Sequence, residues 1–318
     1  MMQNKSIHKK LHSWYQEHGR FDLPWRRTDD PYHIYVSEIM LQQTQVKTVL
    51  ERYYFQFLEK FPSLEALAAA PLDDVLKMWE GLGYYTRARN LHATAQICVT
   101  SLPKTYEELL ALPGIGKNTA SALCAFAYRQ PLAVMEANVK RILSRIHAEE
   151  NPSDDTLRRY ALDLLDVKNP YDYNQAMMDI GSLLCTPKEP GCSLCPFSGI
   201  CKAYDEGYFL YPVKKKKSVP IREEKWLVKS CDKRVHMKQR KGKFLHGLWG
   251  FEKVDSYQDR YFLGEVTQTY THFKLYVKIY HDSTPSDEKH YSENEINSLA
   301  LSGVDKKVIH LLKINKIL

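Results

Sequence analysis

Apolar residues recur at helical spacing over the first half of the chain, whereas short runs alternate between apolar and polar residues in its last third. A period near 3.6 residues indicates a helix, and a period of two indicates a strand. The first pattern predicts helices at 31–43, 46–60, 72–79, 87–99, 106–111, 119–128 and 156–165. The second predicts strands at 225–230, 234–238 and 273–280, followed by helices at 293–300 and 304–312. We therefore expect a mainly α domain followed by a smaller α+β domain, with Asp154 or Asp155 as the N-cap of the last helix in the first domain.

A basic segment separates the two patterns. Lys214–Lys217 form a run of four lysines between Pro212 and Pro220. Proline interrupts helices and inner strands, and adjacent like charges repel each other, so we expect a solvated linker. Contact of these lysines with nucleic-acid phosphates is the alternative. The expected domains are residues 1–202 and 223–318, joined by a basic linker at 203–222.

Composition adds an expectation about the partner. The 318 residues are 44% hydrophobic, with a formal net charge of +7 and a pI near 8.8, which favours a polyanionic partner. No stretch reaches the roughly 18 apolar residues of a membrane-spanning helix, and residues 1–10 lack the apolar core of a signal peptide. We expect a cytoplasmic monomer without membrane contact, in which Cys98, Cys124 and Cys231 are reduced thiols.

Four further cysteines fall in one short segment. Cys185, Cys192, Cys195 and Cys201 are separated by six, two and five residues. Thiolates that converge from one loop hold zinc or an iron–sulfur cluster. A structural zinc site usually takes two close pairs, whereas here only the central pair is close. The spacing favours a [4Fe–4S] cluster in a loop at 185–201, with zinc as the second interpretation and unligated cysteines as the third.

A glycine-containing turn lies between two of the predicted helices. Its sequence, Leu-Pro-Gly-Ile-Gly-Lys, includes Leu112, Gly114, Gly116 and Lys117. Such a turn points backbone N–H groups outward at the start of the second helix, where they bind phosphate. A plain turn between packed helices is the alternative. The cysteine loop downstream favours the phosphate site.

Glu38 is an isolated charge in an apolar helix. It is the only formally charged residue between Asp30 and Lys47, and its helical neighbours include Ile34 and Leu41. Burial disfavours an ionised carboxylate and raises its pKa, which suits a general acid. An exposed glutamate on an amphipathic face is the alternative, and it fits poorly because this stripe is apolar.

Glu136 is a second isolated carboxylate, with no other charged residue between Arg129 and Lys140. At the start of a helix it would be stabilised by the helix dipole. That structural role is compatible with a catalytic one.

These features occur together with the strings at Leu23–Arg26, Ser37–Gln45, Gly81–Tyr85 and Asn174–Asp179. In this order they resemble the helix-hairpin-helix DNA glycosylases, and more narrowly the MutY-type adenine DNA glycosylases, over about residues 8–202. The resemblance implies a helix-hairpin-helix glycosylase domain with a [4Fe–4S] cluster, which acts on double-stranded DNA containing adenine mismatches. One departure stands out: the family has aspartate and glycine where this chain has Glu136 and Ala137.

The resemblance implies roles for both carboxylates. Glu38 would protonate adenine at N7, and Glu136 would stabilise the electron-poor sugar as the N-glycosidic bond breaks. Glutamate keeps the charge of the family's aspartate but is longer by one C–C bond, about 1.5 Å. Because a misplacement of about 1 Å costs on the order of 10²-fold in rate, slow chemistry is expected unless the local backbone compensates.

Other site residues also come from the resemblance. Relatives that cut the strand form a Schiff base through a lysine at the position of Asn118, so base removal without strand cleavage is expected here. Gln43 and Tyr84 would wedge into the duplex beside the extruded base, although Tyr84 as a packed core aromatic is the alternative. The DNA or base contacts implied are Trp25, Arg26, Gln43, Tyr84, Leu112, Gly114, Gly116, Lys117, Asn118, Asn138 and Gln175.

Residues 223–318 faintly resemble the Nudix-like domain with which MutY-type enzymes recognise 8-oxoguanine. Residues 246–251 match its Gly-Leu-Trp turn, and Tyr270, Thr271 and His272 fall where the family has a loop that contacts the oxidised guanine. An ordinary strand-entry segment is the alternative. Nothing here resembles the glutamate-rich helix of Nudix hydrolases, so hydrolysis of free nucleotides is not expected.

Three functions are compatible with the sequence. The preferred one is a monofunctional DNA glycosylase that removes adenine opposite 8-oxoguanine or guanine in base-excision repair. The second is a catalytically weak protein that binds mismatched DNA, which Glu136 suggests. The third is a related glycosylase with another target, such as thymine opposite guanine, which the C-terminal domain disfavours.

Overall fold

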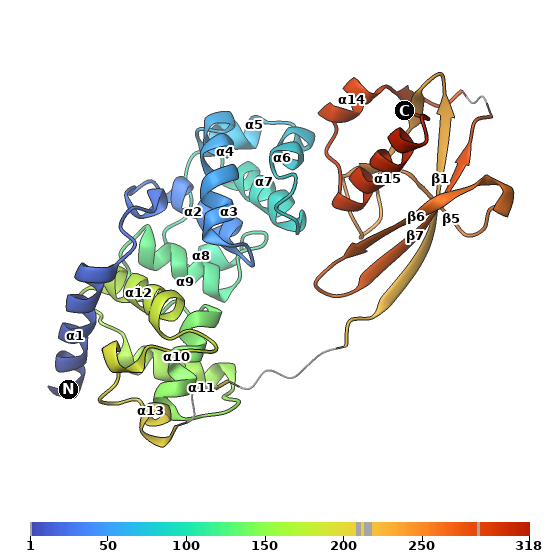
Figure 1. Cartoon of the computed structure of the whole chain (residues 1–318). Coiled ribbons are helices and arrows are strands. Elements are labelled where there is room, and N and C mark those ends of the chain that lie inside the picture. The colour runs from blue at the N-terminus through green and yellow to red at the C-terminus, as the bar shows by residue number, and fades with distance from the viewer. Residues whose placement is uncertain (1, 208–210, 213–217, 285–286) are drawn as a thin grey trace. The chain divides into compact units, whose positions relative to one another are not determined.

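The computed structural model describes residues 2–207, 211–212, 218–284 and 287–318 (Figure 1). It divides into two compact units, residues 1–58 with 97–215 and residues 59–96 with 216–318. This division groups 59–96 with the C-terminal residues, so the expected domain boundaries at 202 and 223 stay a prediction. The expected linker begins with a short helix, α13 (Lys202–Glu206). Its lysines Lys214–Lys217 lie outside the described residues.

Helices make up the first two thirds of the chain. Their bounds are α1 (Met2–His18), α2 (Pro31–Leu41), α3 (Val46–Arg52), α4 (Tyr54–Lys60), α5 (Leu64–Ala69), α6 (Leu72–Met78), α7 (Thr86–Cys98), α8 (Tyr106–Leu110), α9 (Lys117–Phe126), α10 (Ala137–His147), α11 (Asp154–Leu164) and α12 (Pro170–Asp179). The helix predicted at 46–60 is two helices, because Tyr53 leaves the helical region with φ −130°. Within the described residues, every helix falls short of the length and apolar character needed to cross a bilayer.

Local signals explain where these helices begin. Pro31 occupies the first position of α2, and the Asp30 side chain accepts a hydrogen bond from the Tyr32 N–H at 2.8 Å. The expected N-cap of α11 is wrong. Ser153 caps this helix and accepts from the Thr156 N–H at 3.1 Å, while Asp154 and Asp155 lie in the first turn, where their charge favours the positive end of the helix dipole.

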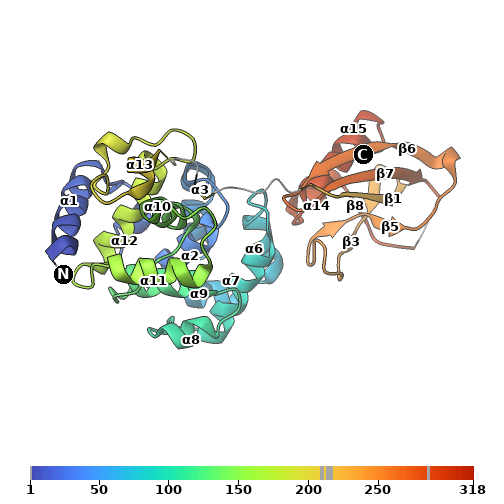
Figure 2. The ribbon, with the colours of Figure 1, turned by 90° about the horizontal axis from the view of Figure 1, so that it is seen from below.

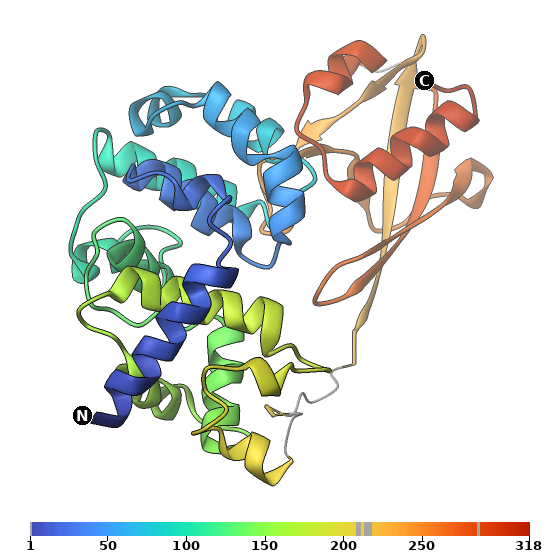
Figure 3. The ribbon, with the colours of Figure 1, turned by 60° about the vertical axis from the view of Figure 1, so that its left-hand side comes forward.

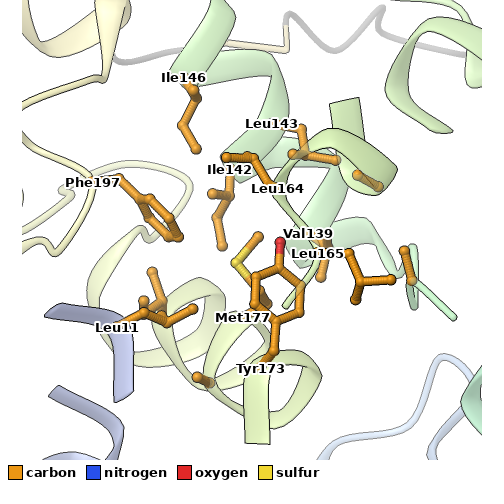
Figure 4. Close-up of a cluster of buried hydrophobic side chains, with 14 of the residues drawn as sticks. Leu11, Val139, Ile142, Leu143, Ile146, Leu164, Leu165, Tyr173, Met177 and Phe197 are labelled. Carbon is orange, nitrogen blue, oxygen red and sulfur yellow. The ribbon is translucent and has the colours of Figure 1, made fainter. Parts of the chain in front are cut away.

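The core of the first unit forms between α1, α10, α11 and α12. Leu11 of α1 and Leu143 of α10 are fully buried, and Phe197 of the cysteine segment packs in the same cluster (Figure 4). Figures 1 and 2 show α1 beside α12 and α10 beside α13. The apolar pattern predicted none of α1, α10 and α12, although the structural role considered for Glu136 placed a helix start where α10 begins. For α10 the signal was present, because Val139, Ile142, Leu143 and Ile146 recur at helical spacing and are all buried.

The C-terminal residues form a mixed sheet with two helices. Their bounds are β1 (Ile221–Cys231), β2 (Arg234–His236), β3 (Lys238–Gln239), β4 (Trp249–Gly250), β5 (Glu252–Val254), β6 (Phe262–Thr269), β7 (Lys274–Asp282), β8 (His290–Tyr291), α14 (Glu293–Ser298) and α15 (Gly303–Ile314). The main sheet has the order β6-β7-β1-β2-β8, and β5 pairs with β1. β1 and β7 run parallel, from Ile221 opposite Lys274 to Lys229 opposite Asp282. The sequence pattern did not predict β6.

Helix α15 covers one face of this sheet (Figure 3). Trp226 and Val228 of β1, Val277 of β7 and Val308 of α15 belong to one buried cluster. A capping box starts α14, in which Ser292 and Glu295 exchange hydrogen bonds. The mainly α part followed by a smaller α+β part confirms the predicted fold class.

Candidate active site

Glu38 lies on α2, a helix that is apolar on nearly all sides. Its neighbours Val36, Ile39 and Met40 are buried, and Glu38 itself is half-buried. Burial raises the pKa of Glu38 to about 8, the charge of Glu136 adds to this rise, and Arg26 opposes it. Glu38 is therefore a carboxyl group that holds its proton at neutral pH.

Glu136 is the N-cap residue of α10, at the end of an extended segment. Burial raises its pKa, whereas the Ala137 N–H, Lys140 and Asn118 each act to lower it. The side-chain amide of Asn118 donates a hydrogen bond to Oε1 of Glu136. The Ala137 N–H, Lys140 and Asn118 thus favour the anion of Glu136. For Glu38, burial and the charge of Glu136 both favour the neutral form. The structure thus places the two predicted catalytic carboxylates where the charge of Glu136 acts on Glu38. Burial raises the pKa of both groups, and for Glu136 three neighbouring groups counteract that rise.

A buried asparagine that was not predicted as a site residue fixes the segment before Glu136. Asn174 of α12 is 2% exposed. Its Oδ1 accepts from the Val134 N–H at 2.9 Å, and its Nδ2 donates to the Leu132 and Pro170 carbonyls at 2.9 and 2.7 Å. All the polar atoms of this amide are therefore directed at backbone. The sequence signal for Asn174 was its place in the string Asn174–Asp179, on which the resemblance to DNA glycosylases partly rests.

A buried ion pair holds the expected pocket residue Arg26. Its Nη1 and Nη2 donate to the two carboxylate oxygens of Asp179 at 2.7 and 2.8 Å. Arg20 donates to the same carboxylate through N and Nε. Burial acts to raise the pKa of Asp179, but the hydrogen bonds from Arg26 overcome it and keep this pKa low. The sequence signal for Asp179 was its position as a lone charge in an apolar run.

Helices α8 and α9 form the predicted hairpin. Gly114 has φ +72°, a conformation that favours glycine, and Gly116 is the N-cap of α9. Leu112 and Ile115 are buried and anchor the turn, whereas Gly116 and Lys117 are exposed. The outward-facing side of this turn is thus formed by glycine backbone and a cation at the start of a helix.

The remaining predicted contact residues differ in exposure. Gln43 and Tyr84 are exposed and adopt left-handed backbone conformations, with φ 57° and 47°. Trp25 and Gln175 are buried, and Trp25 packs edge-on against Tyr54 with ring centroids 5.2 Å apart. Exposed non-glycine residues at positive φ are frequent at functional sites. Contact of any of these four residues with a base stays a prediction.

The four clustered thiols line one cavity, together with Arg145 and Leu184. Arg145 is buried, and its Nη1 donates to Sγ of Cys185 at 3.2 Å and to the Thr186 carbonyl at 2.7 Å. Burial raises the pKa of Cys195 to about 12, and the charges of the other three cysteines act in the same direction. Among the described residues, no group of three or more His, Cys, Asp or Glu is arranged to hold a single metal ion.

Tyr270, Thr271 and His272 follow β6. Tyr270 is half-buried and stacks on Phe273, with ring centroids 4.9 Å apart, whereas Thr271 and His272 are exposed. Within the same compact unit, the hydroxyl groups of Tyr84 and Thr271 form a hydrogen bond. Two residues predicted separately, one as a wedge and one as a guanine contact, are therefore neighbours in this unit.

Comparison with known proteins agrees with this geometry. Residues 36–166 match the HhH-GPD superfamily of base excision DNA repair proteins. The chain is 40% identical over 205 residues to the adenine DNA glycosylase of Buchnera aphidicola subsp. Baizongia pistaciae, covering 62% of this chain and 58% of that protein. It is 42% identical over 211 residues to the adenine DNA glycosylase of Homo sapiens, covering 61% of this chain and 38% of that protein. The matched part of the chain thus spans 58% of the length of the Buchnera protein and 38% of the length of the human protein.

Solved structures are also similar to part of this chain. A thermostable thymine-DNA glycosylase matches with a TM-score of 0.59 and 28% sequence identity, over 65% of this chain and 100% of that chain. The similarity confirms the predicted glycosylase type of fold.

The raised pKa of Glu38 predicts how stability depends on pH. The folded protein keeps this proton up to a pKa of about 8, whereas the unfolded chain loses it near 4.5. The contribution of Glu38 to stability is therefore complete below about pH 4.5 and is lost as the pH rises through about 8. Glu38→Gln cannot ionise, so its free energy of unfolding should increasingly exceed that of the wild type across this window. We expect a difference on the order of 1–2 kcal/mol at about pH 8, reduced because the side chain keeps some solvent contact.

Urea unfolding of both proteins at about pH 5 and about pH 8 measures this difference. A parallel pH dependence in the two proteins would contradict the raised pKa.

Proposed function

We propose that this chain is a monofunctional DNA glycosylase that removes adenine mispaired with 8-oxoguanine or guanine. The match of residues 36–166 to the HhH-GPD superfamily of base excision DNA repair proteins supports the proposal. The observation that carries the proposal is the pair Glu38 and Glu136. Burial raises the pKa of Glu38 to about 8, whereas three groups beside Glu136 counteract the rise that burial causes in its pKa. The adenine DNA glycosylases among its relatives support adenine as the base that is removed.

The reaction uses both carboxyl groups. Glu38 donates its proton to N7 of the adenine, and the C1′–N9 bond breaks with its electron pair moving to the base. The Glu136 anion stabilises the positive charge that develops on the sugar. Water then adds to C1′, and the proton that it releases returns to Glu38. Asn118 has no amine that could attack C1′, so the strand is left intact.

DNA is the proposed partner, bound by a monomer. Exposed backbone at Gly116 and the Lys117 cation suit a phosphate of the duplex. Gln43 and Tyr84, both exposed, suit insertion beside the extruded base. Thr271 and His272 suit contact with the oxidised guanine.

The four thiols fit a [4Fe–4S] cluster. Cys185, Cys192, Cys195 and Cys201 line a common cavity, and four thiolates from one loop are the usual ligand set of such a cluster. When bound, the iron centre would cross-link the loop at 185–201. Arg145 already donates a hydrogen bond to one of the sulfurs.

Glu38→Gln tests the catalytic proposal. This variant keeps the shape of the side chain but has no proton to donate, so adenine excision should fall by at least on the order of 10²-fold. The measurement is single-turnover excision on a duplex with adenine opposite 8-oxoguanine, together with the Kd for the same duplex, which should change little. Glu51→Gln, an exposed position on α3, is the matched control.

Other outcomes separate the alternatives. Full activity of Glu38→Gln would exclude Glu38 as the acid. A wild-type protein that binds the mismatch without excising it would be the mismatch-binding protein, and excision of thymine opposite guanine would identify the third function.

Gly116→Ala tests the hairpin. A Cβ at Gly116 would meet no protein atom within 4 Å, and the residue has φ −87°, so folding should be unaffected. A methyl group beside the phosphate should raise the Kd for matched and mismatched duplexes alike, on the order of tenfold. Fluorescence anisotropy measures both constants. Gly242→Ala, where a Cβ also meets nothing within 4 Å, is the control. Unchanged affinity of Gly116→Ala would argue against a phosphate at this turn.

Metal analysis tests the cofactor. Protein purified without oxygen should be yellow-brown and contain about four irons per chain. Cys195→Ser should lower the iron content and solubility. Stoichiometric zinc without iron would instead support the second interpretation of the cysteine spacing.

A further inference from the structure

Asn118 contacts two adjacent residues of the segment that carries Glu136. Its Nδ2 donates to Oε1 of Glu136, and its Oδ1 accepts from the Met135 N–H at 2.7 Å. We propose that Asn118 is a positioning residue for the Glu136 carboxylate, and that it is the local adaptation that allows a glutamate to act at this position. The inference rests on the proposed function and gives Asn118 a role other than the DNA or base contact implied by the resemblance.

The chemistry of an amide explains why asparagine suits this role. A side-chain amide has one acceptor oxygen and a donor NH₂ group in a single plane. The Met135 N–H can only be bound by the oxygen, so the NH₂ group is turned toward Glu136. An aspartate at 118 would keep the first contact and lose the second. A lysine would lose the first.

The length of glutamate explains why positioning is needed. Compared with aspartate, Glu136 has one more rotatable bond between its backbone and its carboxylate, so a fixed backbone alone leaves that group less defined. The backbone up to Val134 is held by Asn174 through the contacts at 2.9 Å. Asn118 then binds the next two residues: it accepts a hydrogen bond from the Met135 N–H and donates one to the Glu136 carboxylate. Hydrogen bonds thus hold the backbone at Leu132, Val134 and Met135 and the side chain of Glu136.

The position of Asn118 links this contact to the hairpin. It lies in the first turn of α9, two residues after Gly116. A displacement of the hairpin would therefore also move the amide that holds Glu136. We expect the same turn that faces a DNA phosphate to define where the sugar-stabilising charge lies.

Two substitutions separate the two contacts of Asn118. Asn118→Asp keeps the acceptor for Met135 but replaces the donor to Glu136 with a repelling oxygen, whereas Asn118→Ala removes both contacts. Single-turnover excision of adenine opposite 8-oxoguanine, with enzyme in excess, should slow by about 10- to 10²-fold in each. Asn169→Ala is the matched control, because Asn169 also donates to a carboxylate, that of Asp166 at 3.2 Å, at the start of a different helix.

A double variant distinguishes positioning from a general structural effect. If Asn118 acts through the Glu136 anion, adding Asn118→Ala to Glu136→Gln should change the excision rate by less than about threefold. Glu136→Asp should also be slower than the wild type, because its shorter side chain withdraws the carboxylate from the amide. An equal loss from Asn118→Ala in the wild-type and Glu136→Gln backgrounds would overturn the proposal, as would a wild-type rate in Asn118→Asp.

A titration independent of activity completes the test. Carbon-13 NMR of the glutamate carboxyl groups should show a higher pKa for Glu136 in Asn118→Ala than in the wild type, because the lost hydrogen bond favoured the anion. An unchanged pKa would overturn the proposal. A wild-type protein without excision activity would overturn the proposed function instead, and this titration would then decide the role of Asn118 by itself.

Discussion

The burial of two neighbouring carboxyl groups is the constraint on which the site depends. The charge of Glu136 acts on Glu38, and burial raises the pKa of both groups. Two such groups cannot both ionise readily, so one keeps a proton and the other carries the charge. Glu38 lies in an apolar stripe, whereas Glu136 has an amide, a backbone N–H and a lysine nearby. The proposed division of roles between acid and anion therefore rests on their surroundings, since both residues are glutamates.

The surrounding helices supply buried polar groups that keep this pair in place. Asn174 binds the segment before Glu136, and Asp179 binds Arg26, whose positive charge acts on Glu38. Each of these groups is buried with several hydrogen bonds, so removal of one partner would leave another unsatisfied. Both supports lie on α12; Asn174 holds the backbone before Glu136, and Asp179 holds Arg26. We infer that α12, which carries no proposed acid, is the element that holds the two halves of the site together.

The glutamate at position 136 is then an alteration of the site that its surroundings accommodate. A longer side chain at this position would misplace the charge if nothing held its end. We propose that Asn118 provides that contact, and the resemblance to glycosylases implies that strand-cutting relatives have a lysine at this position. One residue thus accounts both for the absence of an amine that could attack the sugar and for the placement of the longer carboxylate.

Sequence alone determined the features that depend on local pattern. The helices α2, α6, α7 and α15, the glycine turn, the cysteine spacing and the isolated charge of Glu38 were all readable, because capping, periodicity and desolvation in an apolar stripe are properties of neighbouring residues. Only the tertiary structure decided which side chains meet across distant segments. Asn118 with Glu136, Asn174 with Val134 and Arg26 with Asp179 are separated by 18, 40 and 153 residues. Such contacts follow from how helices pack on one another, and packing depends on the whole core, which no local pattern records.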